Sequence, residues 1–224
     1  MLFKTKNKTE TKTKQAFTLA EVLITLSIIG VVAALTIPTL IQRTGNEEYV
    51  AKLNKAYSTL AQATEMIMTE NGGAKTWATS TENIYKLYKE HLRNSKDCGT
   101  ASGCFASGYY RYLNGNNWAK LNELGNKFRT FVLADGVSVM VDDSISENCS
   151  ASWNGTNDTC AHFYVDLNGK KAPNQAGRDL FFLHIKADGL YPAGCDYDAC
   201  TLTNPSESGF GCACKVILEG DMKY

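Results

Sequence analysis

The chain has 224 residues, near the size of one ordinary domain plus an additional segment, and its 23 Lys and Arg residues equal its 23 Asp and Glu residues in number. Zero net charge excludes a generally basic nucleic-acid-binding protein and an acidic solvating tail, so no nucleic-acid partner is expected. With 44% apolar and 21% charged residues, the composition is typical of a globular protein rather than a disordered one.

The overall balance of charge hides a strongly basic N-terminus. Residues 1–16 carry five lysines and one glutamate, a net charge of +4, whereas the other 208 residues carry 18 basic and 22 acidic side chains, a net charge of −4. The uncharged run Val22–Ile41 follows, and its 20 residues are enough to cross about 30 Å of hydrocarbon as a helix. Because Lys and Arg remain on the cytoplasmic side, the pattern predicts a cytoplasmic leader before a single membrane span.

Three interpretations of this segment compete. The first is a cleaved secretory signal with a small-residue site at Val32–Ala34, and the second is an uncleaved signal anchor. The third is a segment in which Glu21, close to the start of the apolar stretch, has a functional role. A carboxylate within a bilayer costs about 2.5–3.5 kcal/mol, and a plain signal or anchor gains nothing from it. If the chain is cut between Ala16 and Phe17, Glu21 becomes the fifth residue of a helix that starts with a free α-amine, where a carboxylate suits the helix dipole. Amine and carboxylate can then pair between neighbouring copies, which makes Glu21 an assembly residue.

The segment Lys14–Pro38, KQAFTLAEVLITLSIIGVVAALTIP, resembles the type IV prepilin cleavage and methylation signature of pilins and type II secretion pseudopilins. The resemblance implies that a prepilin peptidase cuts between Ala16 and Phe17, that Phe17 becomes the N-methylated first residue, and that Glu21 is the assembly glutamate. Ala16 is a departure, because the family usually has Gly there. The implied partners are copies of the chain or other pilin-like subunits, the prepilin peptidase and the inner-membrane assembly platform.

The resemblance also implies a location and a function. The chain is expected to cross the bacterial inner membrane once, with its leader in the cytoplasm and its head outside, and then to enter a pilus or pseudopilus as a structural subunit. The alternative is a secreted or membrane-tethered disulfide-rich binding domain with an ordinary signal sequence, for which a mature N-terminus after Ala34 is the sign. A membrane-tethered hydrolase would need a pocket in which a histidine and an acid converge.

Helical periodicity continues beyond the apolar run. The residues at spacings of three and four are Tyr49, Leu53, Tyr57, Leu60, Thr64 and Ile67, with Ala56 and Ala63 on the same face. Gly72-Gly73 is expected to end this helix, and Gly45-Asn46 to bend or loosen it unless the segment stays helical. The expected organisation is a basic leader 1–16, a transmembrane and assembly helix 17–41, an amphipathic helix 42–71 and a globular pilin-like head 72–224.

The remainder of the chain changes from helix to strand signals. A short helix is predicted over Glu82–Arg93, and residues 128–134 and 137–143 form the clearest hairpin because Asp135-Gly136 suits a type I′ turn. Helices followed by strands predict an α+β fold, in which a long N-terminal helix, with a membrane half and an amphipathic half, packs on a small antiparallel sheet with a disulfide-rich C-terminal region. The further predicted strands are residues 162–167, 179–186 and 215–219.

Eight cysteines in the C-terminal two-thirds of the chain, behind an export-type N-terminus, suggest disulfides formed outside the cytoplasm. Cys212 and Cys214 would share one face of the predicted strand, so each is expected to pair elsewhere, with a residue such as Cys195 or Cys200. Zinc bound by these four cysteines is the alternative. The short loops that disulfides would close are those from Cys98 to Cys104 and from Cys149 to Cys160.

Few residues suggest catalysis. His91, His162 and His184 are predicted to be isolated from one another and to be surface or sheet-packed side chains. No enzyme activity is therefore expected.

One predicted loop gathers hard oxygen ligands. Asp166, Asn168, Asn174 and Asp179 are of the types that chelate calcium, and some of the major pseudopilins that the chain resembles hold calcium in their head loops. The stretch lacks the later acids of an EF-hand loop, and Asp and Asn are also ordinary turn residues. Turns without a cofactor are the main expectation, with calcium as the minor one.

Overall fold

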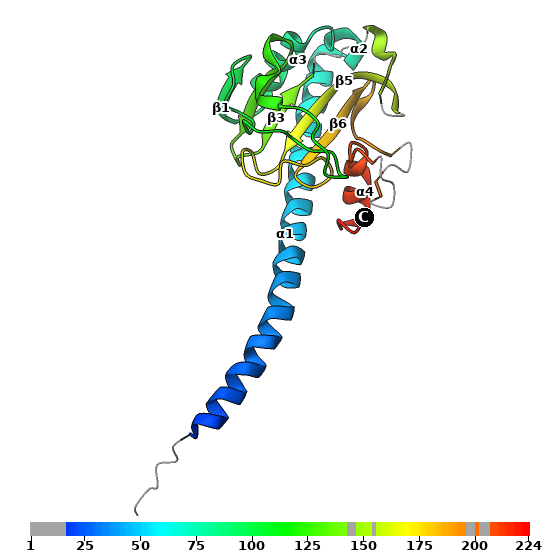
Figure 1. The fold of residues 1–224 in the computed structure, drawn as a ribbon. Coiled ribbons are helices and arrows are strands. Elements are labelled where there is room, and N and C mark those ends of the chain that lie inside the picture. Colours follow the sequence, from blue (N-terminus) through cyan, green and yellow to red (C-terminus); the bar gives the residue numbers. More distant parts are fainter. Residues whose placement is uncertain (1–16, 143–146, 154–155, 196–199, 202–206) are drawn as a thin grey trace, which may run out of the picture. The chain divides into compact units, whose positions relative to one another are not determined.

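Figure 1 shows the chain as a computed structural model that describes residues 17–142, 147–153, 156–195, 200–201 and 207–224. The chain divides into two compact units with a boundary between Thr44 and Gly45. Residues up to Thr44 form the N-terminal unit, and Gly45–Tyr224 form the C-terminal unit.

An apolar helix makes up the described part of the N-terminal unit. Helix α1 spans Leu19–Asn71, and its first 20 residues, Leu19–Pro38, have a mean hydropathy of 2.3 with none of that stretch buried. This segment is long and apolar enough to cross a membrane, as the sequence predicted. The hydroxyls of Thr25 and Ser27 donate to the carbonyl oxygens of Val22 and Leu23, at 3.0 and 2.8 Å, so they add little cost in hydrocarbon.

The C-terminal unit begins with the amphipathic part of α1. The apolar side chains that it buries are Val50, Leu53, Ala56, Leu60, Ala63 and Ile67. This stripe agrees with the predicted periodicity, although Tyr49 and Tyr57 are only partly buried. The helix ends at Asn71, where Gly72 adopts a φ of 82° and its N–H donates to the carbonyl oxygen of Met68 at 2.9 Å. The predicted end is confirmed, and the helix runs uninterrupted through Gly45-Asn46.

Two short helices follow, α2 (Ala74–Trp77) and α3 (Thr81–His91). Ser80 caps α3, because its hydroxyl accepts a hydrogen bond from the N–H of Asn83 at 3.1 Å. The predicted helix was to continue to Arg93, but α3 ends at His91 because Leu92 is extended, with φ −111° and ψ 141°. The carbonyl oxygen of Arg93 then accepts a hydrogen bond from Ala134 at the end of the neighbouring strand.

An antiparallel sheet follows, with the strand order β1-β2-β3-β5-β6-β7 and β4 paired with β5. The predicted hairpin is β2–β3, but its turn is not the predicted type I′, because that type needs a positive φ at both Asp135 and Gly136 and only Gly136 has one, 89°. The predicted strands 162–167 and 179–186 correspond to β5 and β6, apart from their outer residues 167 and 179. The strands among the described residues are β1 (Asn94–Gly99), β2 (Arg129–Leu133), β3 (Ser138–Val141), β4 (Ala151–Trp153), β5 (Thr156–Asp166), β6 (Leu180–Lys186) and β7 (Gly189–Pro192).

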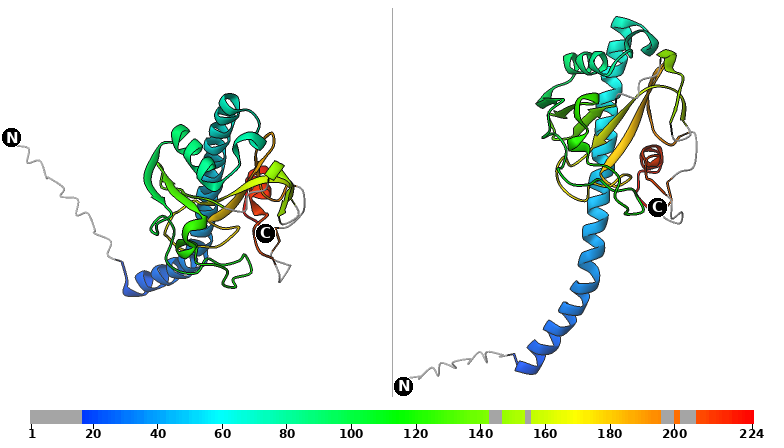
Figure 2. Two further views of the ribbon diagram at one scale, coloured as in Figure 1. Left: turned by 90° about the horizontal axis from the view of Figure 1, so that it is seen from above. Right: turned by 45° about the horizontal axis from the view of Figure 1, so that its top comes forward.

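Both faces of the sheet are covered. Phe131, Phe163 and Leu183 share one hydrophobic core with the buried stripe of α1 and with α3, which lie against this face (Figure 2). Tyr164 and Phe182 belong to a second core on the other face, together with buried side chains from residues 104–121. Because adjacent residues of a strand point to opposite faces, two covered faces explain why β6 and the second half of β5, residues 160–165, read as nearly continuous apolar runs.

The predicted strand at residues 215–219 is wrong. This segment belongs to helix α4 (Cys212–Glu219), which ends at Gly220 with a φ of 65°. β-branched Val216 and Ile217 favour a strand locally. Four residues of α4 are buried, Cys212, Ala213, Cys214 and Val216, and all but Cys214 share one helical face, so burial of that face decides the outcome.

Disulfides pair all eight cysteines, each of which lies among the described residues. Cys212 and Cys214 do not share a strand face as predicted, because both lie in helix α4, where two positions along the chain turn the side chains by about 200°. They still pair elsewhere, as expected. The pairs are Cys98–Cys104, Cys149–Cys160, Cys195–Cys214 and Cys200–Cys212.

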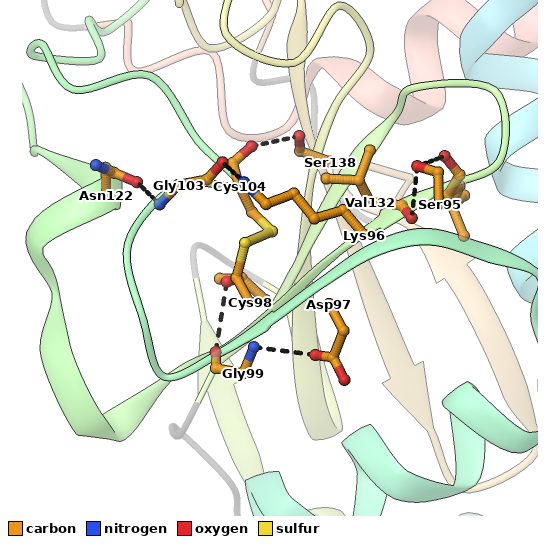
Figure 3. The surroundings of a disulfide bond; sticks show 12 residues. Ser95, Lys96, Asp97, Cys98, Gly99, Gly103, Cys104, Asn122, Val132 and Ser138 are labelled. Carbon is orange, nitrogen blue, oxygen red and sulfur yellow. Dashed lines mark hydrogen bonds between the residues drawn. A yellow bond between two sulfur atoms is a disulfide. The ribbon is translucent and has the colours of Figure 1, made fainter.

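The first of these disulfides ties the edge strand β1 to the segment that follows it (Figure 3). Polar contacts hold the same loop: Lys96 Nζ donates to the carbonyl oxygen of Gly103 at 2.9 Å, and the N–H of Gly103 donates to Asn122 Oδ1 at 2.6 Å. Ser138 Oγ on β3 donates to the carbonyl oxygen of Cys104 at 2.6 Å. The disulfide thereby fixes the start of the segment that covers the second core.

The loop lengths predict a ranking of the disulfides by their effect on stability. Cys195 and Cys214 are 19 residues apart and Cys98 and Cys104 only 6, so the first disulfide restricts the unfolded chain more. Replacing Cys195 and Cys214 by Ser is expected to lower the free energy of unfolding by about 3 kcal/mol, and replacing Cys98 and Cys104 by about 2 kcal/mol. Urea unfolding in detergent followed by tryptophan fluorescence measures both. Alkylatable thiols in the unfolded, unreduced wild-type chain would contradict the pairing.

Candidate functional site

The first described residue is Phe17, whose side chain is 87% exposed just before α1 begins. Phe17 and Glu21 are therefore close in the chain at the exposed start of the apolar helix. Ala16 lies outside the described residues, so cleavage between Ala16 and Phe17 stays a prediction.

Glu21 closes a capping box with Thr18 at the start of α1. The N–H and the hydroxyl of Thr18 both donate to Glu21 Oε2, at 2.9 and 2.8 Å, and the N–H of Glu21 donates to Thr18 Oγ1 at 3.2 Å. These bonds satisfy backbone donors that a helix start leaves without partners, and the carboxylate suits the positive end of the helix dipole. Thr18 and Glu21 both lie in the prepilin-like segment of the sequence, but the capping role of Thr18 was not predicted, although the spacing Thr-x-x-Glu is the signal of this motif.

The capping box leaves one carboxylate oxygen available. Both hydrogen bonds from Thr18 go to Oε2, and within the described residues no donor contacts Oε1 of Glu21. After Glu21, α1 carries exposed apolar side chains such as Leu23, Ile24 and Ile28, whose exposed fractions are 56–61%. The N-terminal end of α1 thus combines an apolar surface with a fixed carboxylate, and one oxygen of that carboxylate remains able to accept a bond from another molecule.

A second polar cluster lies where β5 ends and β6 begins. Asp166 and Asp179 are both fully buried. Asp166 accepts hydrogen bonds from the Tyr110 hydroxyl and from the N–H of Asn168, and Asp179 accepts them from the N–H groups of Asn174 and Gln175 at 2.8 and 2.7 Å. Burial, and then the charge of Asp179, raise the pKa of Asp166 well above its usual range, while burial raises the pKa of Asp179.

The structure brings together the four residues proposed from the sequence as calcium ligands. Asn168 Oδ1 and Asn174 Oδ1 are buried and have no hydrogen-bond partner, while Asn168 Nδ2 donates to the Tyr49 hydroxyl at 3.0 Å. Two carboxylates and two amide oxygens are hard ligands, which suit calcium rather than zinc. Asp166, Asn168, Asn174 and Asp179 therefore fit a calcium ion by their chemistry, and calcium binding stays a prediction. No group of three or more His, Cys, Asp or Glu able to hold a metal occurs in the part of the chain that the structure describes.

The prediction that the histidines are isolated is wrong for two of them. His162 on β5 lies directly opposite His184 on β6, with 2.8 Å between their Nδ1 atoms and both rings buried. Burial lowers the pKa of His162 to about 4 and that of His184 to about 3, so both rings are neutral near pH 7 and one N–H can donate to the other nitrogen. The pairing depends on strand register, which single residues in a sequence do not reveal. His91 is separate and contacts Glu70, with 3.3 Å between Nε2 and Oε2.

Comparison with known proteins gives two family matches. A model described as a family of unknown function, DUF6613, matches residues 39–189, which is more than half of the chain. The chain belongs to this family. A second model, described as the prokaryotic N-terminal methylation motif, matches residues 11–37.

The methylation motif covers Ala16, Phe17 and Glu21, and it supports the type IV prepilin-like signature recognised in the sequence. The DUF6613 match extends from α1 to the start of β7 and so contains the cluster around Asp166 and Asp179. No curated protein and no solved structure matches the chain significantly.

The buried carboxylates lead to a test for calcium. A site occupied at a hundred times its dissociation constant stabilises the folded chain by about 2.7 kcal/mol, so calcium in place of EDTA is expected to raise the melting temperature by about 5–10 °C. Asp179→Asn is expected to abolish this shift. Asp188→Asn, which changes an exposed aspartate outside the cluster, is expected to keep it. Scanning calorimetry of the chain in detergent makes the comparison, and equal wild-type melting temperatures with calcium and with EDTA would refute the site.

Proposed function

We propose that this protein is a structural subunit of a type II secretion pseudopilus or a type IV pilus, which polymerises through its N-terminal helix after a prepilin peptidase removes residues 1–16. The methylation motif together with the apolar helix indicates a pilin-like or pseudopilin subunit with a single membrane anchor. The observation that carries the assembly step is the carboxylate of Glu21, fixed at the start of an exposed apolar helix.

Assembly rests on a charge pair between copies. Cleavage before Phe17 creates an α-amine close to the start of α1, and Glu21 Oε1 can accept a hydrogen bond from the amine of a neighbouring copy. The capping box holds Oε2 on Thr18 and so restricts the side chain before the partner arrives, which lowers the entropic cost of pairing. In a surrounding of low dielectric, such a pair attracts more strongly than it would in water.

The exposed apolar side chains make transfer from bilayer to filament feasible. Lipid tails and the side chains of neighbouring helices are similarly apolar, so exchanging one for the other costs little hydrophobic free energy. The hydroxyls of Thr25 and Ser27 bond to their own helix and need no new partner in either surrounding. The direction of transfer then depends on the polar pair at the start of the helix and on contacts outside the membrane.

The basic leader and the disulfides support one orientation. Lysines in residues 1–16 favour a cytoplasmic leader in the inner membrane, and four disulfides among the described residues favour an oxidising compartment for the rest of the chain. The proposed partners are further copies or other pilin-like subunits, the prepilin peptidase and the assembly platform. We propose a mechanical role and no catalytic one.

The first prediction from this function concerns processing. The protein extracted from membranes is expected to begin at Phe17 and to carry one methyl group on its α-amine, which mass spectrometry of the intact chain and its N-terminal peptide measures. Ala16→Gly is expected to keep or improve cleavage, and Ala16→Leu to block it. Intact Met1 or Leu35 as the sole N-terminus would rule the processing out, and Leu35 would favour the alternative of a disulfide-rich binding domain with an ordinary signal.

The second prediction concerns Glu21. Glu21→Ala is expected to be inserted and processed normally yet to be absent from sheared filaments, because removing one partner of a buried charge pair costs about 3–5 kcal/mol. Immunoblots of membrane and filament fractions measure both steps. Normal incorporation of Glu21→Ala into filaments would contradict the pairing and leave the processing intact.

Two control variants separate this role from general damage to the helix. Thr18→Ser keeps the hydroxyl that holds Glu21 Oε2 and is expected to assemble. Glu47→Ala removes an exposed carboxylate from α1 outside the apolar segment and is also expected to assemble.

A further inference from the structure

A groove lies along α1 within the C-terminal unit, beside the edge of the sheet that β1 forms. Its volume is about 450 Å³, and a second hollow of about 400 Å³ continues it, sharing Gln62 and Met66. Ala63, Leu92 and Leu133 contribute apolar surface to the groove, and Met66 is 51% exposed there. The floor of the groove is apolar, but Ala63, Leu92 and Leu133 are each at most 9% exposed, so Met66 supplies most of the apolar surface that the C-terminal unit leaves uncovered.

Lys55, His91 and Arg93 are the basic side chains that line the groove. Lys55 pairs with Asp135 at 2.9 Å, and His91 contacts Glu70. Arg93 is exposed, and among the described residues it forms no ion pair. An occupant that suits the groove therefore combines an apolar side chain with a carboxylate.

Helix α4 presents this combination. Leu218 is 79% exposed, the largest exposed fraction among the large apolar side chains described in Gly45–Tyr224. The next residue, Glu219, is exposed as well and forms no ion pair within the described residues. An exposed leucine beside a carboxylate at the end of a short helix complements the apolar floor and Arg93.

The groove and α4 lie at opposite edges of the sheet, so α4 does not contact the groove of its own chain. Arg93 directly precedes the edge strand β1, whereas α4 is bonded beside the other edge strand, β7, through the N–H of Cys214 and the carbonyl oxygen of Ala193. Five strand spacings separate β1 from β7, which amounts to about 24 Å. Figure 1 shows β1 at the left edge of the sheet and α4 at the lower right, with β3, β5 and β6 between them.

We propose that the end of α4 of one copy docks in the groove of a second copy, with Leu218 on Met66 and Leu92, and Glu219 paired with Arg93. The inference rests on the proposed function, because two different surfaces at opposite edges make a head-to-tail contact, which repeats from copy to copy as a polymer requires. A second copy is favoured over a lipid surface because Glu219 places a negative charge beside Leu218, which anionic headgroups would repel.

Cysteine cross-linking in filaments tests the contact. The native cysteines are all paired, so Met66→Cys and Leu218→Cys introduced into one chain supply the only free thiols. Oxidation of assembled filaments is expected to give a ladder of covalent multimers. The control joins Met66→Cys with Tyr109→Cys. Tyr109 is also exposed, at 51% against 79% for Leu218, but its neighbour Tyr110 lies in the second core on the other face of the sheet, so this pair is expected to give no ladder.

Charge reversal tests the pairing within this contact. Arg93→Glu or Glu219→Arg alone, in the double-cysteine chain, is expected to reduce the ladder at least about fivefold, and the two together to restore it. Neither residue belongs to the N-terminal site, so processing at Phe17 is expected to be unchanged in all of them.

The outcomes separate this contact from the proposed function. Filaments that form normally but give no ladder, or equal ladders from test and control pairs, would overturn the docking and leave the polymerising function standing. The docking would also be overturned if the Leu218→Cys thiol reacted equally fast with a water-soluble maleimide in the free subunit and in the filament. It would likewise be overturned if lipid vesicles alone protected this thiol from the maleimide. Absence of wild-type filaments would contradict the proposed function itself, and the docking with it.

Discussion

Twenty residues of α1, Leu19–Pro38, carry apolar side chains that no other part of the described chain covers, and water is the least favourable surrounding for them. This surface is stable only against lipid hydrocarbon or against other helices. The polar groups at and near the start of α1 are arranged in a way that allows both surroundings. A carboxylate at its start is held by Thr18, hydroxyls within it bond to their own helix, and the charged leader precedes it. The apolar surface therefore determines where the chain can reside and what it can bind.

The same helix meets a different requirement after Gly45. There its buried side chains, such as Leu53, Leu60 and Ile67, recur on one stripe, and the opposite side of the helix is polar. The sheet supplies Phe131 and Phe163 against that stripe, so the helix is covered on one side by its own chain. The first part of α1 thus exposes its whole surface to other molecules, whereas the part after Gly45 is buried on one side by its own chain.

Local signals in the sequence were enough to predict these two halves of α1, its end at Gly72 and the hairpin around Asp135-Gly136, because each depends on residues close in the chain. Features that depend on distant residues were not predictable. Strand β1 has the sequence NSKDCG, whose strand preference is weak, and it forms because β2 offers pairing partners. Packing made 212–219 a helix despite Val216 and Ile217, and strand register brought His162 to His184. At the candidate site, Glu21 was evident as a charge in an apolar segment, whereas Thr18 was noted only as part of the prepilin-like signature, and its contact with Glu21 became clear once the start of α1 was known.

Charge also limits how copies can approach one another. Without residues 1–16, the side chains carry 18 basic against 22 acidic groups, a net charge of −4, so copies repel weakly over distances that salt screens beyond about 8 Å. A general electrostatic attraction is thus excluded as the reason for assembly, and binding has to come from short-range matches between specific groups. An exposed cation such as Arg93 is valuable on an acidic molecule for this reason. It attracts a carboxylate of a neighbour at close range, while the surplus of acids keeps unmatched surfaces apart, so the same net charge that weakens association in general makes it selective.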